Sequence, residues 1–248
     1  MTEPVIERGS GLDAATVPPK PEKSSLLDDF MDLFYAPSAV FARREKSSFW
    51  IPLLIVSALL GLVFVANRDL MQPIMEAEMS RAMAKQGTQL TEEQLKGMQK
   101  VSGVLGSVGA FVFAPITMMF VGLITWLVGK FVDSKQTLNA AIMVAAFAYV
   151  PKVVEGILMR VQGTLIDTSS FTSPFSFSIG LGRFLDPDTT SPILLALLGR
   201  VDVFTIWVTV LLVIGLAVTG KISRGKAAIA GVIVWLLGAL PQLARGLQ

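Results

Sequence analysis

The sequence predicts an all-α integral membrane protein, in which a disordered N-terminal tail and a short amphipathic helix precede a bundle of five transmembrane helices. Of its 248 residues, 52% are hydrophobic and 16% are charged, and the mean hydropathy is +0.63. Soluble domains carry about 25% charged residues, so this chain has too little charge to cover a soluble globule. The apolar residues also gather in stretches close to the ~17–25 residues that cross a bilayer.

The N-terminal tail, residues 1–25, contains four prolines, scattered charges and no hydrophobic periodicity. Such a composition cannot bury enough apolar surface to order the chain. We therefore expect a disordered cytoplasmic tail in front of a membrane domain at 26–248.

A short helix is predicted from Ser25, a good N-cap residue, to Tyr35. Three aspartates, at positions 28, 29 and 32, fall on its polar side. One interpretation is a helix lying on the bilayer surface. Because anionic lipid would repel three aspartates, docking onto a basic partner protein is the alternative. The candidate partner-binding residues, all on the apolar side, are Leu27, Phe30, Met31 and Phe34.

Five charge-poor segments follow. The second has 29 uncharged residues between Lys100 and Lys130 with Pro115 near its middle, which favours a long, tilted or kinked helix. The third continues past Pro151 and carries two charges. The predicted spans are about 48–66, 101–129, 138–159, 203–220 and 227–244.

Lysine and arginine set the predicted orientation. Eight of these residues crowd three short segments on the side of the N-terminus, around Arg43, Lys130 and Lys221. The opposite side has nine, spread over two long loops and the C-terminus, with acidic residues among them in the first loop. We expect the N-terminus in the cytoplasm and the C-terminus outside.

The third span contains Pro151, Lys152 and Glu155, the candidate intramembrane polar site. Lys152 and Glu155 are three residues apart and so share a helix face. Lys152 lies about 21 Å along a helix that starts at Leu138, in the outer third of the bilayer. A structural ion pair near the outer interface and a functional polar site are both consistent with this position.

Small residues recur every four positions in the second span, which allows another helix to approach closely. The simplest interpretation is that these small residues pack against another helix inside the bundle. Homodimerisation and a substrate path are the alternatives. The candidate helix-packing residues are Ser102, Gly106, Ala110 and Ala114.

The chain contains no histidine and no cysteine. That excludes histidine-based triads, thiol nucleophiles and cysteine or histidine metal sites. The net charge of +2 does not favour nucleic acid. We therefore predict no catalytic residues, no metal site and no cofactor, and expect that the protein is not an enzyme.

Three segments together resemble the bacterial branch of the Yip (Ypt-interacting protein) family of multi-pass membrane proteins. They are LFYAPSAVF at Leu33–Phe41, AAFAYVPKVVEGIL with its proline at Pro151, and VDVFTIWVTVLLVIGLAVTG at Val201–Gly220. The resemblance covers 26–248. It implies a five-helix bundle with a cytoplasmic N-terminal region in the bacterial cytoplasmic (inner) membrane, and it supplies no catalytic residue. Eukaryotic relatives act with Rab-type GTPases in vesicle formation.

The resulting hypothesis is a non-enzymatic membrane protein that organises or recruits partners at the membrane, with the segment around residues 26–41 as its cytoplasmic handle. Expected partners are membrane lipids, a cytoplasmic protein and a second copy of the chain. The alternative is a transporter or permease component that uses Lys152 and Glu155. A membrane enzyme ranks third.

Overall fold

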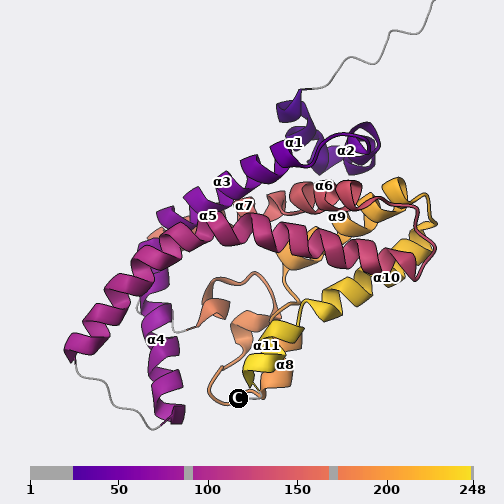
Figure 1. Ribbon diagram of the computed structural model, residues 1–248. Helices are drawn as coiled ribbons and strands as arrows, with labels where there is room; N and C mark the ends of the chain where they lie inside the picture. The colour runs from indigo at the N-terminus through magenta and orange to yellow at the C-terminus, as the bar shows by residue number, and fades with distance from the viewer. Residues whose placement is uncertain (1–24, 87–91, 168–172, 247–248) are drawn as a thin grey trace, which may run out of the picture.

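The computed structural model describes residues 25–86, 92–167 and 173–246 and is helical through most of that length (Figure 1). The predicted disordered tail lies outside the described residues, apart from Ser25. No β-strand occurs in the described ranges, where a single isolated bridge joins Gly180 and Asp202. The helices are α1 (Leu26–Tyr35), α2 (Pro37–Arg44), α3 (Trp50–Ala66), α4 (Arg68–Gln86), α5 (Glu92–Lys130), α6 (Leu138–Ala148), α7 (Val150–Leu165), η2 (Pro174–Phe177), η3 (Leu181–Phe184), α8 (Pro192–Leu198), α9 (Val203–Gly220), α10 (Arg224–Leu237) and α11 (Leu240–Gly246).

The membrane-spanning bundle predicted from the sequence is confirmed. Among the described residues, four helical segments are long and apolar enough to cross a membrane, at Leu105–Lys130, Leu138–Leu165, Val203–Gly220 and Arg224–Ala244. The first predicted span is the exception, because α3 has only 17 residues. Helix α3 and the first part of α4 together are long and apolar enough for a fifth span, although the two helices meet at a bend of 73°.

Two of the spans differ in detail from their predicted forms. Helix α5 runs without a break through Pro115 and is 39 residues long. The third span breaks into α6 and α7 at Tyr149, two residues before Pro151, which lies in the first turn of α7. Proline cannot donate the backbone hydrogen bond that would continue α6, so the interruption lies where the sequence places the ring. The span also extends beyond the predicted end, to Leu165.

Helix α6 is the centre of the bundle. Its residues from Ala140 to Ala148 are all buried, and α2, α3, α5 and α9 pack around it. Five of these nine residues are alanines, whose small side chains let neighbouring helices come close on every side. An all-round apolar helix of this kind is expected in a bundle interior.

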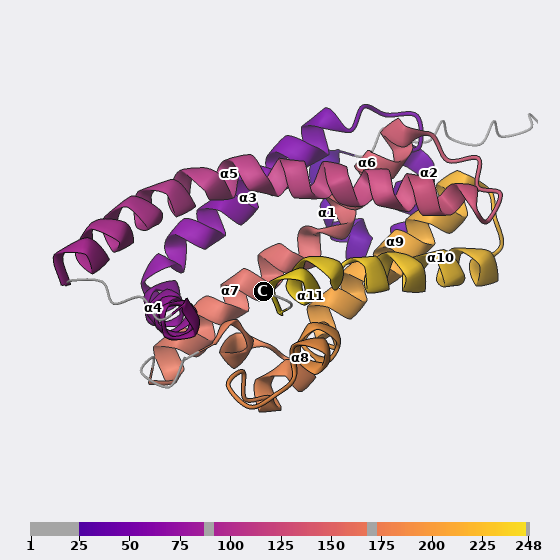
Figure 2. The same ribbon diagram turned by 60° about the horizontal axis from the view of Figure 1, so that its bottom comes forward.

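Helix α5 is the longest element, with α3 beside one half and α6 beside the other (Figure 1). Helices α4, α8 and α11 lie away from α1 and α2 in Figure 1, and the turned view in Figure 2 shows α4 apart from α8. Leu70 and Ile74 of α4 form a small buried cluster with Phe177 of η2. An ion pair between Arg81 and Asp188, 2.7 Å, also joins α4 to the second long loop.

The three basic segments meet at one end of the bundle. Lys221 pairs with Glu45 and Lys226 pairs with Asp133, each at 2.6 Å. The backbone N–H of Lys135 also donates to the carbonyl of Gly220 at 2.9 Å. The three segments are far apart in the sequence, yet they lie together at one end of the bundle. This agrees with the prediction that their positive charges are on the same side of the membrane.

Candidate functional site

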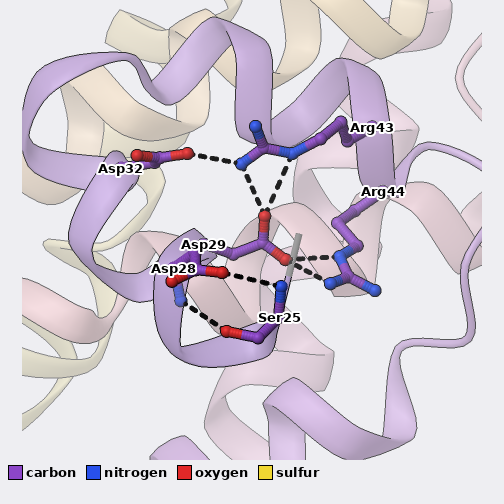
Figure 3. Close-up of polar contacts among 6 residues, drawn as sticks. All are labelled: Ser25, Asp28, Asp29, Asp32, Arg43 and Arg44. Atoms are coloured by element: carbon purple, nitrogen blue, oxygen red, sulfur yellow. Dashed lines mark hydrogen bonds and ion pairs between the residues drawn. The ribbon is translucent and has the colours of Figure 1, made fainter. Parts of the chain in front are cut away.

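Helix α1 begins with a capping box, shown in Figure 3. The Ser25 hydroxyl accepts a hydrogen bond from the backbone N–H of Asp28 at 3.1 Å, and the Asp28 carboxylate accepts one from the N–H of Ser25 at 2.9 Å. These bonds satisfy donors that the first turn leaves unpaired. The hydrogen bonds with Ser25 also lower the pKa of Asp28. The predicted helix and its N-cap are confirmed.

Asp29 lies between two arginines of α2 (Figure 3). Its side chain is fully buried, and its two oxygens pair with Arg43 at 2.6 Å and with Arg44 at 2.5 Å. Arg43 also pairs with Asp32 at 2.7 Å, and its hydrogen bonds to Asp32 and Asp29 raise the pKa of Arg43. Each arginine directs two nitrogens at one Asp29 oxygen, and such charge-assisted hydrogen bonds are stronger than those between neutral groups.

These ion pairs join the start of α1 to the end of α2, so the two helices run antiparallel. We call residues 26–44 the N-terminal hairpin. The structure here differs from the sequence-based expectation that all three aspartates would face outward. The basic group nearest to Asp29 belongs to the chain itself, fourteen and fifteen residues away.

The four predicted partner-binding residues divide into two pairs. Phe30 packs against Phe147 of α6 and Phe34 against Trp207 of α9, each with ring centroids 5.3 Å apart. The side chains of Leu27 and Met31, by contrast, are 70% and 60% exposed.

Tyr35 extends the exposed side of α1 and was missed in the sequence analysis. It is 85% exposed and follows Met31 by four residues, as Met31 follows Leu27, so the three lie along one helix face. That spacing could have identified it. We call Leu27, Met31 and Tyr35 the exposed stripe.

The N-terminal hairpin lies along the bundle rather than flat across its end. Phe147 is the tenth residue of α6, which places it about 14 Å along that helix. Phe30 reaches this level from α1, and Leu33, Val40 and Phe41 join the same buried core. One face of α1 is therefore packed on the side of the bundle, and its placement on the bilayer surface stays a prediction.

The predicted polar site gathers further groups around Lys152. The ammonium lies 2.7 Å from the Glu155 carboxylate, 3.2 Å from the Thr205 hydroxyl and 3.9 Å from the Asp202 carboxylate. Pro151, which directly precedes Lys152, is buried. The side chains of Lys152 and Glu155 are 28% and 34% exposed, so the cluster is half-buried. One ammonium between two carboxylates is an arrangement that can hold a cation or pass a proton.

Asp202 and Thr205 were not predicted as site residues. Asp202 is the N-cap of α9, where one oxygen accepts from the N–H groups of Phe204 and Thr205 at 3.0 and 2.9 Å. The sequence signal was an aspartate directly before an apolar span. The contact between Asp202 and Lys152 could not be predicted from the sequence, because the two residues are fifty positions apart.

Arg200 closes the same end of the bundle against α10. Its guanidinium donates to the carbonyl of Gly238 at 3.0 Å and lies over the ring of Trp235, 5.7 Å from the centroid. Burial lowers the pKa of Arg200. Arg200 therefore fixes the end of α10 next to the polar cluster.

The small residues of α5 face partly onto α3. A side chain at Gly106 would meet Phe64 of α3 at 3.8 Å, and Ala110 and Ala114 are half-buried. The side chain of Ser102 lies outside the described residues. Tighter crossings occur at glycines that were not predicted, among them Gly122 and Gly215. A Cβ at Gly122 would lie 2.7 Å from the Cα of Ile142 in α6, and one at Gly215 would lie 2.2 Å from the Val144 side chain.

Comparison with known proteins matches residues 31–244 to the Yip1 domain. The chain is also 27% identical over 232 residues to the membrane protein YknW of Bacillus subtilis (strain 168), an alignment that covers 93% of this chain and 90% of YknW. No solved structure matches it significantly. The matched region takes in the polar cluster and most of the N-terminal hairpin. The chain is a membrane protein that belongs to the Yip1 domain family.

Proposed function

We propose that this protein recruits or organises partner proteins at the membrane without catalysing a reaction, and that the N-terminal hairpin is its docking element. The observation that carries the proposal is the division of α1. One side is fixed to the bundle by Asp29, Phe30 and Leu33, while the exposed stripe presents three large side chains that the bundle leaves uncovered. Rigid presentation of aromatic and methionine side chains is typical of protein interfaces.

The amino-acid composition is consistent with a role in binding rather than catalysis. The chain has no histidine and no cysteine, which removes the commonest general bases and nucleophiles. A second copy of the chain and membrane lipids remain proposed partners beside a cytoplasmic protein.

We further propose that the protein lies in a bacterial cytoplasmic membrane with its N-terminus inside. The support is the meeting of the three basic segments at the end of the bundle where the hairpin is attached, since positive segments are retained in the cytoplasm. A topology reporter fused after Gln248 should report an external C-terminus. A strong cytoplasmic signal from that fusion would reverse the orientation.

Replacing Leu27 and Met31 together by serine should remove a protein partner while leaving the fold intact. Both side chains are exposed, and such substitutions usually change stability by no more than about 0.5 kcal/mol. The measurement is quantitative mass spectrometry of proteins that co-purify with the full chain in native lipid discs.

The matched control for this double variant is Phe131→Ser. Phe131 is 86% exposed in the segment after α5, at the same end of the bundle, so it tests whether any exposed apolar residue suffices. A partner retained by the double variant, or lost equally in the control, would count against docking through α1.

A transporter component is the second candidate function, favoured by the half-buried cluster of Lys152, Glu155 and Asp202. If it conducts protons or potassium ions, Glu155→Gln should abolish their flux in reconstituted vesicles. Asp133→Asn, which removes an exposed ion pair at the other end of the bundle, is the control. Flux by the wild-type chain that disappears only with Glu155→Gln would favour transport over recruitment.

A further inference from the structure

A groove of about 470 Å³ opens at the end of the bundle opposite the basic segments. We infer that it binds one phospholipid, with the phosphate paired to Arg183 and an acyl chain running from the groove along α9. This inference is independent of docking at the N-terminal hairpin. It rests on the shape of the groove, its continuation into a spanning helix and an arginine that forms no ion pair within the described part of the chain.

The groove forms where the segment around η3 runs antiparallel to the residues that precede α9. The N–H of Leu181 donates to the carbonyl of Val201 at 2.9 Å, and the N–H of Val203 donates to the carbonyl of Ile179 at 3.1 Å. Gly180 lies at the crossing, where a Cβ would come 2.2 Å from the Val201 oxygen. The close approach holds the two walls together, so the groove is built into the fold.

The lining is mostly apolar and open. Ile179 and Leu181 on one wall are 41% and 47% exposed, and Val203 and Ile206 on the other are 52% and 47% exposed. Its volume falls within the ~300–1,000 Å³ range of small-molecule sites. Apolar side chains exposed in this way favour a hydrocarbon occupant.

The apolar surface continues from the groove into the membrane. Val203 and Ile206 share a helix face with Val210, which is 47% exposed, at spacings of three and four residues. Because α9 is a spanning helix, this face leads from the groove into the hydrocarbon layer. An acyl chain fits that path, whereas a soluble ligand would end at the groove.

Arg183 supplies the charge. Its side chain is exposed, and it lines the groove without an ion pair or side-chain hydrogen bond to any residue in the described part of the chain. The other charged lining residue, Asp202, already pairs with backbone N–H groups and faces Lys152. Arginine binds phosphate through two parallel hydrogen bonds, and headgroup phosphates lie at the ends of spanning helices. The Arg183 guanidinium therefore favours a phospholipid headgroup as its partner.

The test is native mass spectrometry of the full-length protein in detergent, titrated with a phosphatidylglycerol of defined chain length. The wild-type chain should retain one tightly bound lipid. Arg183→Gln should weaken this binding about tenfold or more, the loss expected for one charge-assisted contact, and Ile206→Trp should weaken it by filling the groove. Arg183→Lys should restore part of the affinity.

Two matched variants and one competitor separate this site from general lipid adhesion. Arg224→Gln removes an exposed cation at the other end of the bundle, and Ile229→Trp enlarges an exposed side chain on α10. Both should retain the lipid, and excess inorganic phosphate should not displace it. Equal losses with Arg183→Gln and Arg224→Gln, unchanged binding with Arg183→Gln, or displacement by phosphate alone would overturn the proposal.

Discussion

Gly122→Ala is expected to destabilise the bundle more than any other single methyl addition at an unstrained helical glycine. A Cβ there would lie 2.7 Å from the Cα and 3.0 Å from the N of Ile142. Backbone atoms cannot move aside as the end of a side chain can, so α5 and α6 would have to separate. Because α6 is the centre of the bundle, the separation would loosen packing on several sides. Overpacking of this kind typically costs about 1–3 kcal/mol.

Thermal unfolding in detergent measures the effect of Gly122→Ala. Gly225→Ala is the matched control, since a Cβ at that glycine meets nothing within 4 Å. The control should unfold at the wild-type temperature or slightly above it, because alanine is the better helix former. Equal stability of the two variants would show that α5 and α6 do not cross as closely as the structure indicates.

Asp29→Ala is expected to release α1 from α2 and from the bundle. The substitution removes a fully buried carboxylate and leaves Arg44 without its Asp29 contact and Arg43 with Asp32 alone. Removing one partner of a buried pair costs about 3–5 kcal/mol. We expect about 2–3 kcal/mol here, because the two arginines are 35% and 24% exposed and water can compensate in part.

Limited proteolysis and hydrogen exchange of residues 26–35 report the release of α1 directly. Asp32→Ala is the comparison, since Asp32 is 42% exposed and its pair should contribute less than about 1 kcal/mol. Asp29→Asn keeps the size of the side chain and should fall between the two. Wild-type protection of α1 in the Asp29→Ala variant would mean that the ion pairs do not hold the hairpin.

The spans could be predicted from the sequence because a helix that crosses lipid needs a long apolar stretch. Whether a residue is apolar does not depend on contacts with distant residues. The limit of that rule is visible at α3, where 17 residues end in a 73° bend. Beyond the bend, α4 packs on Phe177 and pairs with Asp188, which lie more than a hundred residues away in the sequence.

The predicted sites were less complete, because burial and pairing depend on distant contacts. Asp29 and Asp28 have the same chemistry and adjacent positions, yet only Asp29 faces Arg43 and Arg44. Lys152 and Glu155 were found from their three-residue spacing, whereas Asp202 joins them only through the packing of α7 on α9. Gly122 resembled any other glycine in an apolar stretch.

Site-specific photo-cross-linking from α1 in living cells tests the central claim most directly. A photoreactive amino acid at Phe30 should form a cross-link within the chain to α6, since Phe30 packs against Phe147. The same group at Met31, one residue later but on the exposed stripe, should form a cross-link to a second protein. Lipid adducts alone from Met31, or cross-links from Phe30 to other proteins, would contradict a hairpin fixed on one side and available for docking on the other.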